Sequence, residues 1–190
     1  MRRTLPIGGS LLLVASLSVV AVAQDPSAEP SPPAGPEASP CSEEASMRIT
    51  STAFEPEGDI PAQFTCDGED ISPPLTIEDL PPETVSLVLV MDDPDAPMGT
   101  WDHWVAYDIE PTTEIPEAVE ELGTPGTNSW ERTGYGGPCP PSGTHRYFFA
   151  VYALDTKLGW EPGEDKGSVL SRIHDHVLAE ASLLGFYSRE

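Results

Sequence analysis

Histidine, aspartate and tyrosine recur at the ends of apolar runs in this sequence. The residues are Asp93, Asp95, His103, His145 and Tyr147. Each stands near a loop rich in proline or glycine, which is where a β scaffold places a site. Imidazole can donate hydrogen bonds to a phosphate or carboxylate or accept a proton, and the phenol adds a donor. The aspartates could hold the imidazoles in one tautomer or accept from a ligand amine. These residue types predict a small polar site.

Each of these residues also has a structural interpretation. A strand histidine is more often a satisfied structural residue, and the Asp-Pro-Asp of residues 93–95 is more often a turn device than a catalytic pair. The sequence contains no G-x-S-x-G and no H-E-x-x-H motif. Ser142 lies close before His145, but a serine beside proline and glycine is typical of a turn. A hydrolytic enzyme, or a metal site of both histidines and an aspartate, stays an alternative.

The elements that must position these residues begin with GYGGPCPPSG, residues 134–143. Four glycines and three prolines in ten residues exclude a helix or a central strand. Such a loop can bring backbone N–H groups, here those of Gly136 and Gly137, close to an anion. Residues 145–154 are aromatic and β-branched and predict a strand. His145, Tyr147 and Phe149 would then share one of its faces.

The rest of the chain predicts an antiparallel β fold with short strands, proline- and glycine-rich turns and one late helix. Apolar residues on both faces of 84–91 indicate a central strand. The helix of residues 167–177 would have Ser168 as its N-cap, and a short helical turn is expected in 114–122. The expected strands are residues 47–52, 84–91, 101–109, 145–154 and 179–187.

The charge balance is strongly acidic, with a formal net charge of -23. Nucleic acids and anionic membrane surfaces are therefore excluded as partners, because both demand a basic face. The simplest interpretation of this acidity is solubility in a salty or extracellular setting. A bound anion would have to be held by short-range donors, since the long-range field repels it.

The N-terminus predicts export. Residues 1–23 combine Arg2 and Arg3, an apolar run and a small-x-small cleavage site, which is the pattern of a signal peptide. An uncleaved N-terminal membrane anchor is the alternative. Residues 24–46 are rich in proline without apolar periodicity, and we expect a disordered linker. The folded domain would then span residues 47–190, and the protein would be secreted or held in the cell envelope.

Three cysteines leave one over if the chain is exported to an oxidising compartment. Cys41 falls in the expected linker, whereas Cys66 and Cys139 fall in loops expected beside the site. We therefore predict a disulfide between Cys66 and Cys139 with Cys41 unpaired. Two buried free thiols are the alternative.

Longer motifs carry a family resemblance. DPDAP followed by WDHWV, then GYGGPCPPSGTHRYFFAVYALD, resembles the phosphatidylethanolamine-binding protein family, and TCDGEDISPPL resembles its bacterial Raf-kinase-inhibitor-like branch. The resemblance covers residues 47–190. It implies a Greek-key β-sandwich with one or two short peripheral helices and a small anion-binding pocket. By position, the pocket residues would be Asp93, Asp95, His103, Gly137, Pro138, His145 and Tyr147.

The function implied by this resemblance is non-enzymatic binding of a phosphate-type or other small anionic head group, without a cofactor. A protease inhibitor or another regulator acting on a protein partner is an alternative, since the family includes such activities. The long C-terminal helix of the animal members is not evident here, which argues against their kinase-regulating role.

Overall fold

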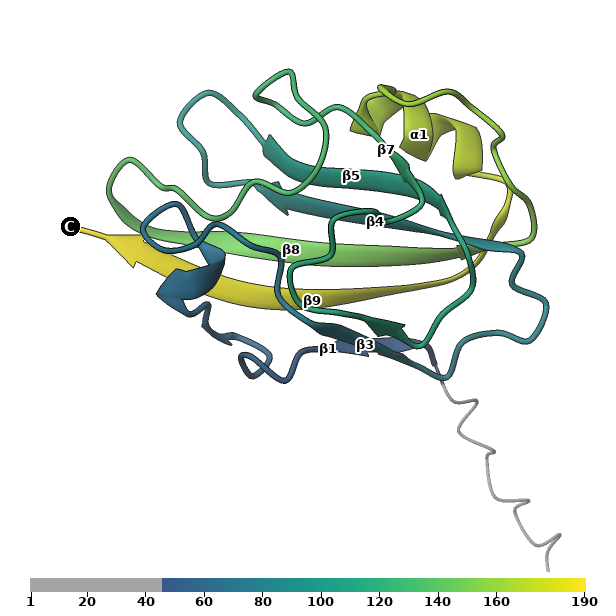
Figure 1. Ribbon diagram of the computed structural model, residues 1–190, viewed down its shortest axis with the longest axis horizontal. Coiled ribbons are helices and arrows are strands. Elements are labelled where there is room, and N and C mark those ends of the chain that lie inside the picture. Colours follow the sequence, from purple (N-terminus) through teal and green to yellow (C-terminus); the bar gives the residue numbers. More distant parts are fainter. Residues whose placement is uncertain (1–45) are drawn as a thin grey trace, which may run out of the picture. The chain divides into compact units, whose positions relative to one another are not determined.

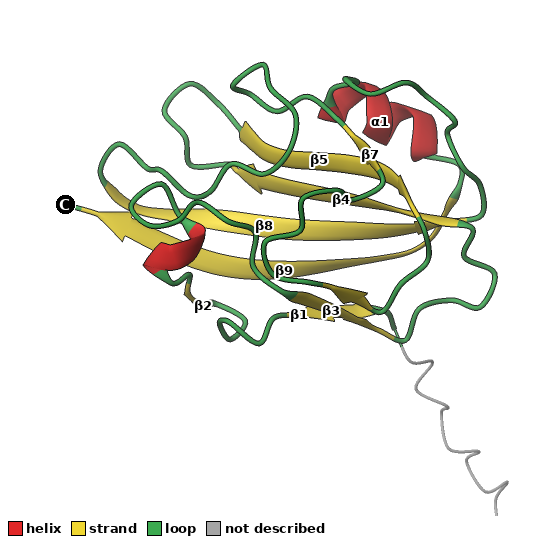
Figure 2. Cartoon of the chain, in the orientation of Figure 1, coloured by secondary structure: helices red, strands yellow, loops and turns green. Residues whose placement is uncertain are grey.

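The structure, a computed structural model, describes residues 46–190. The expected signal peptide, most of the expected linker and Cys41 lie outside the described residues. Nine strands, one α-helix and one 3₁₀ helix make up the described part (Figures 1 and 2). The strands are β1 (Arg48–Thr50), β2 (Gly58–Asp59), β3 (Leu75–Glu78), β4 (Ser86–Asp93), β5 (Trp101–Ile109), β6 (Glu114–Ile115), β7 (Thr124–Pro125), β8 (Gly143–Leu154) and β9 (Val177–Arg189), and the helices are the 3₁₀ turn Ala62–Phe64 and α1 (Lys166–Ile173).

The strands form two sheets. The larger has the order β2-β9-β8-β4-β5-β7 and the smaller the order β1-β3-β6. Every pair is antiparallel except β2 with β9, which is parallel. The antiparallel β-sandwich expected from the sequence is therefore confirmed. β4 lies between β5 and β8 (Figure 1), and it is the central strand that its two apolar faces predict.

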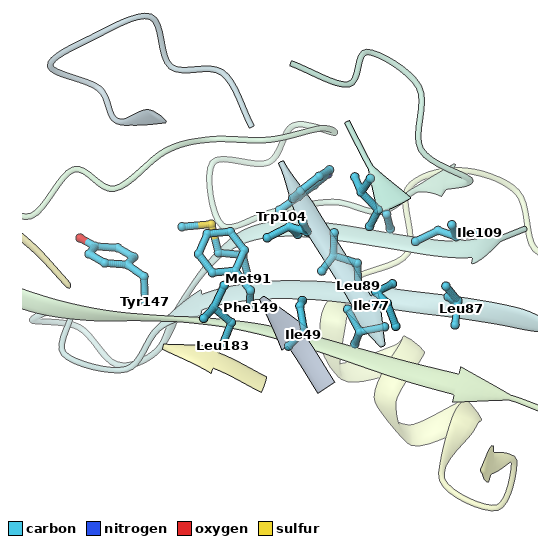
Figure 3. Packing of buried hydrophobic residues seen from close by; sticks show 14 of the residues in the cluster. Ile49, Ile77, Leu87, Leu89, Met91, Trp104, Ile109, Tyr147, Phe149 and Leu183 are labelled. Atoms are coloured by element: carbon cyan, nitrogen blue, oxygen red, sulfur yellow. The ribbon is translucent and has the colours of Figure 1, made fainter. Parts of the chain in front are cut away.

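The main core lies between the two sheets. Aliphatic residues of the small sheet, such as Ile49 and Ile77, pack on one face of the large sheet (Figure 3). Odd-numbered residues of β4 and β8 supply that face because side chains alternate along a strand. The large-sheet members include Leu87, Leu89, Met91, Phe149, Val151 and Leu183.

A second apolar cluster covers part of the opposite face. Val88 and Val90 of β4 pack there with Val169 and Ile173 of α1. Lys166, at the start of the helix, forms ion pairs with Asp92 and Asp102 of the underlying strands. The central strands are therefore buried on one face by the small sheet and on the other by α1. The ion pair of Lys166 with Asp92 also holds α1 against the end of β4, where the candidate site begins.

Several local expectations were wrong. Residues 114–122 contain the two-residue strand β6 and turns rather than a helical turn. Helix α1 ends at Ile173, and residues from Val177 onward belong to β9. Its N-cap is Asp165, whose side chain accepts from Ser168 N at 2.7 Å, so Ser168 lies inside the first turn. Two cap-forming residues stand three apart, and the sequence alone did not rank them.

Candidate functional site

Asp93 and His145 form the buried centre of the site. Asp93 is the last residue of β4, and its side chain turns back so that Oδ1 accepts from Asp95 N at 2.8 Å. Its other oxygen, Oδ2, lies 2.7 Å from His145 Nδ1. Both residues are nearly inaccessible, at 3% and 7% exposure. Because a carboxylate only accepts, His145 carries a proton on Nδ1, and Nε2 is the ring nitrogen left for other partners.

A β-bulge turns His103 toward the same cavity. β4 pairs Met91 with Trp104 and Asp92 with Asp102, so His103 is the extra residue of β5. Strict alternation would place it on the face opposite Trp104, but a bulge re-aims the side chain of the inserted residue. The result is that His103 lines the same cavity as His145.

The His103 ring is fixed through Nδ1, which lies 2.7 Å from the carbonyl oxygen of Gly136. The carbonyl accepts, so Nδ1 carries the proton here as well. Burial lowers the pKa of His103 below its ordinary value, although the Gly136 carbonyl and the Asp93 charge act in the opposite direction. The ring is therefore neutral near pH 7, with the lone pair on Nε2.

Tyr147 lies behind the cavity and is fully buried. Its ring meets the His103 ring edge to face, with centroids 5.3 Å apart. Its hydroxyl points away from the aliphatic side chains (Figure 3) and has no hydrogen-bond partner among residues 46–190. Burial, and then the nearby charge of Asp93, raise the pKa of Tyr147, so the hydroxyl stays protonated.

The cavity has a volume of about 210 Å³ and combines a polar floor with an apolar rim. The floor consists of Asp93, His103 and His145. The rim residues are Ala96, Pro97, Trp101, Trp130 and Pro141, with Cys139 beside them. A cavity of this kind suits a small polar group attached to a less polar body.

The glycine-rich loop supports the cavity, but the backbone N–H groups of Gly136 and Gly137 are not available to a ligand in it. Gly136 N donates to the carbonyl of His103 at 3.1 Å, and Gly137 N donates to Asp70 Oδ1 at 2.7 Å. The expectation that these two N–H groups hold an anion was therefore wrong. A Cβ on Gly137 would lie 2.4 Å from the Phe64 carbonyl oxygen, so glycine is required by the close packing of the two loops. Pro138 is buried and does not line the cavity.

Asp95 lies outside the floor of the cavity. Its carboxylate receives Nε and Nη2 of Arg146 at 2.8 and 2.7 Å and the Arg146 backbone N–H at 3.0 Å. These bonds, the side-chain ones first, hold the pKa of Asp95 down at about 2. Asp95 thus joins the loop after β4 to the start of β8 and positions the site from outside.

The predicted disulfide between Cys66 and Cys139 is present, with Cα atoms 5.5 Å apart. It connects the loop after the 3₁₀ helix to the glycine-rich loop. Cys66 N also donates to the carbonyl of Pro138 at 3.1 Å. The two loops are thus joined by both a covalent and a backbone link at the edge of the cavity.

Comparison with known proteins assigns the family. The family model described as phosphatidylethanolamine-binding protein matches residues 50–188. The chain belongs to the phosphatidylethanolamine-binding protein family. Relatives include UPF0098 proteins of Methanothermobacter thermautotrophicus, 49% identical over 75% of this chain and 99% of the relative, and of Archaeoglobus fulgidus, 48% identical over 78% of this chain. This chain spans only 55% of the Archaeoglobus protein.

Two solved structures of the phosphatidylethanolamine-binding protein family are similar. A homologue from Chlamydia trachomatis is 39% identical, with a TM-score of 0.74 over 76% of this chain and 99% of its own. Escherichia coli YbcL, a member of the mammalian family, is 27% identical, with a TM-score of 0.71 over 77% of this chain and 100% of its own. The sandwich described above is therefore the fold of this family.

Sequence reasoning missed the aromatic rim of the cavity. Trp130 lies in a loop that shows no periodicity, and Trp101 looked like an ordinary strand residue. Trp130 packs edge to face against His103 with centroids 4.9 Å apart, and against Trp101 at 5.5 Å. A tryptophan in a polar loop was the available signal, because so large an apolar side chain needs a packing partner.

Within residues 46–190, no three histidine, cysteine, aspartate or glutamate side chains are grouped so that they could hold a metal ion. None of the helices in this part of the chain is long and apolar enough to cross a membrane.

Proposed function

We propose that the protein is a non-enzymatic binding protein whose cavity takes a phosphate-type or other small anionic head group. One observation carries this proposal. His103 and His145 use Nδ1 for fixed acceptors, the Gly136 carbonyl and Asp93, and both rings line one small cavity. Each Nε2 is thereby the nitrogen available to a ligand.

The protonation states of the imidazoles and of the anion determine how such a ligand is bound. A neutral imidazole with its proton on Nδ1 offers Nε2 only as an acceptor. An anion therefore binds either as a protonated species, such as a hydrogen phosphate, or after Nε2 takes up a proton and becomes a donor. In both arrangements Asp93 Oδ2 accepts the Nδ1 proton of His145, so the ring orientation is the same. Binding is weak for a bare anion because the protein is strongly negative.

The family name and the rim support an organic ligand over a bare ion. Trp101, Trp130 and Pro141 give the anion's substituent an apolar surface to contact. This extends the proposal to phosphate monoesters, whose head group would reach the floor while the rest of the molecule lies on the rim.

Calorimetric titration with inorganic phosphate at pH 6 tests the proposal. The protein should bind phosphate, and His145→Ala should lose most of that binding. The chain offers a matched control, because His176 pairs with Asp155 at 2.9 Å in the same manner but away from the cavity. His176→Ala should bind like the parent protein. Absence of binding by the parent, or equal losses in both variants, would contradict the proposal.

We further propose that the protein acts outside the cytoplasm, with residues 1–23 removed on export. The acidity of the chain and the disulfide support this location. N-terminal sequencing of the protein recovered from the native cell envelope or medium should begin at Gln24.

A further inference from the structure

We propose that the Cys66–Cys139 disulfide is a thiol–disulfide exchange site, and that its reduction loosens the wall of the cavity. Both cysteine residues are exposed, so a dithiol reductant can approach the bond. Cys139 also lines the cavity together with His103 and His145. The bond is therefore at once accessible from solvent and part of the site.

The links between the two loops show what reduction would release. Three hydrogen bonds hold the glycine-rich loop to residues 64–70 independently of the sulfurs. They join Tyr135 to Phe64, Gly137 to Asp70 and Cys66 to Pro138. All three end at or before residue 138 on the glycine-rich loop. The disulfide is the link that reaches Cys139, so its loss frees the rim from residue 139 to Pro141 while the loop behind it stays anchored.

The charges around the two sulfurs favour attack on one of them over the other. Arg189 Nη1 lies 3.6 Å from Cys139 Sγ, and Nε of the same residue is held by Asp67 at 2.9 Å. Tyr187 also donates to Asp67, at 2.8 Å, which fixes the ion pair. A cation beside a sulfur stabilises its thiolate. Cys139 is therefore the better leaving group, and Cys66 Sγ is the atom attacked.

The exchange balances with a dithiol as reductant. Its thiolate attacks Cys66 Sγ, the S–S bond breaks, and the electron pair leaves on Cys139 Sγ. This step leaves a mixed disulfide between Cys66 Sγ and the first sulfur of the reductant. The second thiolate of the reductant then attacks that first sulfur, and Cys66 leaves as a thiolate that takes up a proton. The protein gains two thiols, and the reductant becomes a disulfide.

The experiment uses the full chain with Cys41→Ser, so that two cysteines remain, and compares its oxidised and dithiothreitol-reduced forms. Hydrogen exchange of residues 134–145 requires no ligand. We expect faster exchange at the amides of Cys139 and Ser142 after reduction, since the two prolines between them have no N–H, with Gly136 and Gly137 still protected. Phosphate titration of both forms, which depends on the proposed function, should give a several-fold higher Kd for the reduced form. The double variant Cys66→Ser, Cys139→Ser should match the reduced form in both measurements.

Two controls separate local loosening from general destabilisation. Asp108→Asn weakens the bonds from Leu158 N and Gly159 N to Asp108, away from the cavity, and should leave exchange at the amides of Cys139 and Ser142 unchanged. Arg189→Gln should slow reduction. Identical exchange in the oxidised and reduced forms, or a disulfide that resists dithiothreitol in the folded protein, would overturn the inference. If the oxidised form binds no phosphate, the proposed function fails, and hydrogen exchange still decides this inference.

Discussion

Because of His103, the stability of the folded protein depends on pH. The pKa of His103 is lowered by burial, so the unfolded chain binds a proton at a higher pH than the folded one. Its contribution to stability is fully present above its ordinary pKa of 6.5 and decreases as the pH falls below that value. Phosphate binding should change in the opposite direction, because a protonated Nε2 is a donor.

We therefore expect the melting temperature of the free protein to fall between about pH 7 and pH 5, and phosphate to raise it more at the lower pH. Thermal unfolding across this range, with and without phosphate, measures both effects. In His103→Asn, part of the pH dependence of the free protein should disappear. A phosphate effect of equal size at both pH values would contradict the role assigned to the imidazoles.

For Tyr147 we predict that removing the hydroxyl does not destabilise the protein. Its buried hydroxyl has no partner, and removing an unsatisfied polar group relieves a cost of about 1–3 kcal/mol. Tyr147→Phe should therefore leave the free energy of unfolding unchanged or raise it. Tyr135→Phe is the matched comparison, because Tyr135 donates to the Phe64 carbonyl at 2.7 Å and its loss should cost about 1 kcal/mol. Chemical denaturation of both variants measures the difference.

Residue types alone predicted much of the candidate site. They selected Asp93, His103 and His145, which the structure gathers around one cavity. They could not show that Asp95 is turned to Arg146, because a salt bridge between distant segments has no local pattern. Nor could they show that the amides of the glycine-rich loop are already bonded, since that depends on a close approach of residues 64–70.

At the scale of elements, the bulge in β5 decides the orientation of His103. Alternation predicts the face of a residue only while both strands advance in step. The inserted residue in β5 breaks this rule at the position that the site needs. Strand segments were therefore predictable, whereas the pairing of one strand with its neighbour was not. The very short strands β6 and β7 were missed for a related reason, because two residues contain no period.

The cap of α1 gives a test at this scale. Asp165 accepts from Ser168 N, so Asp165→Ala should lower the free energy of unfolding by about 1 kcal/mol. Ser168→Ala should change it by less than about 0.5 kcal/mol, since the serine side chain does not cap the helix. Urea unfolding of both variants checks the assignment, and a larger loss in Ser168→Ala would reverse it.

Lys166 connects α1 to the large sheet, because its ammonium group pairs with two carboxylates of that sheet. Burial lowers its pKa, but hydrogen bonds to Asp102 and Asp92 more than offset this, and the net pKa is raised. The stabilisation is therefore complete below the ordinary lysine pKa of 10.5 and is lost as the pH rises above it. Lys166→Met should cost about 1–3 kcal/mol at pH 7, because it leaves Asp92 and Asp102 facing each other. Chemical denaturation of the parent protein and the variant at pH 7 measures this loss.

For the whole molecule, the sequence predicted the fold class because the long strands carry clear alternation and the family motifs span the domain. The domain boundary remains a prediction. A chain shortened to residues 47–190 should melt within about 2 °C of the full chain, since residues 24–46 contain too little apolar surface to contribute a core. Calorimetry of both chains decides this, and a loss of several degrees would place part of the fold before Met47.

The parallel pairing of β2 with β9 has a consequence for how the protein is made. Gly58 and Asp59 pair with Gly185 and Phe186, so one of the first segments of the domain waits for almost the last. β8 likewise finds its long partner β9 only after α1 has been synthesised. The pairings of β2 and β8 with β9 therefore cannot form until the last residues of the chain have been synthesised. Pairing between such distant segments slows folding, because the chain must close long loops before these contacts form.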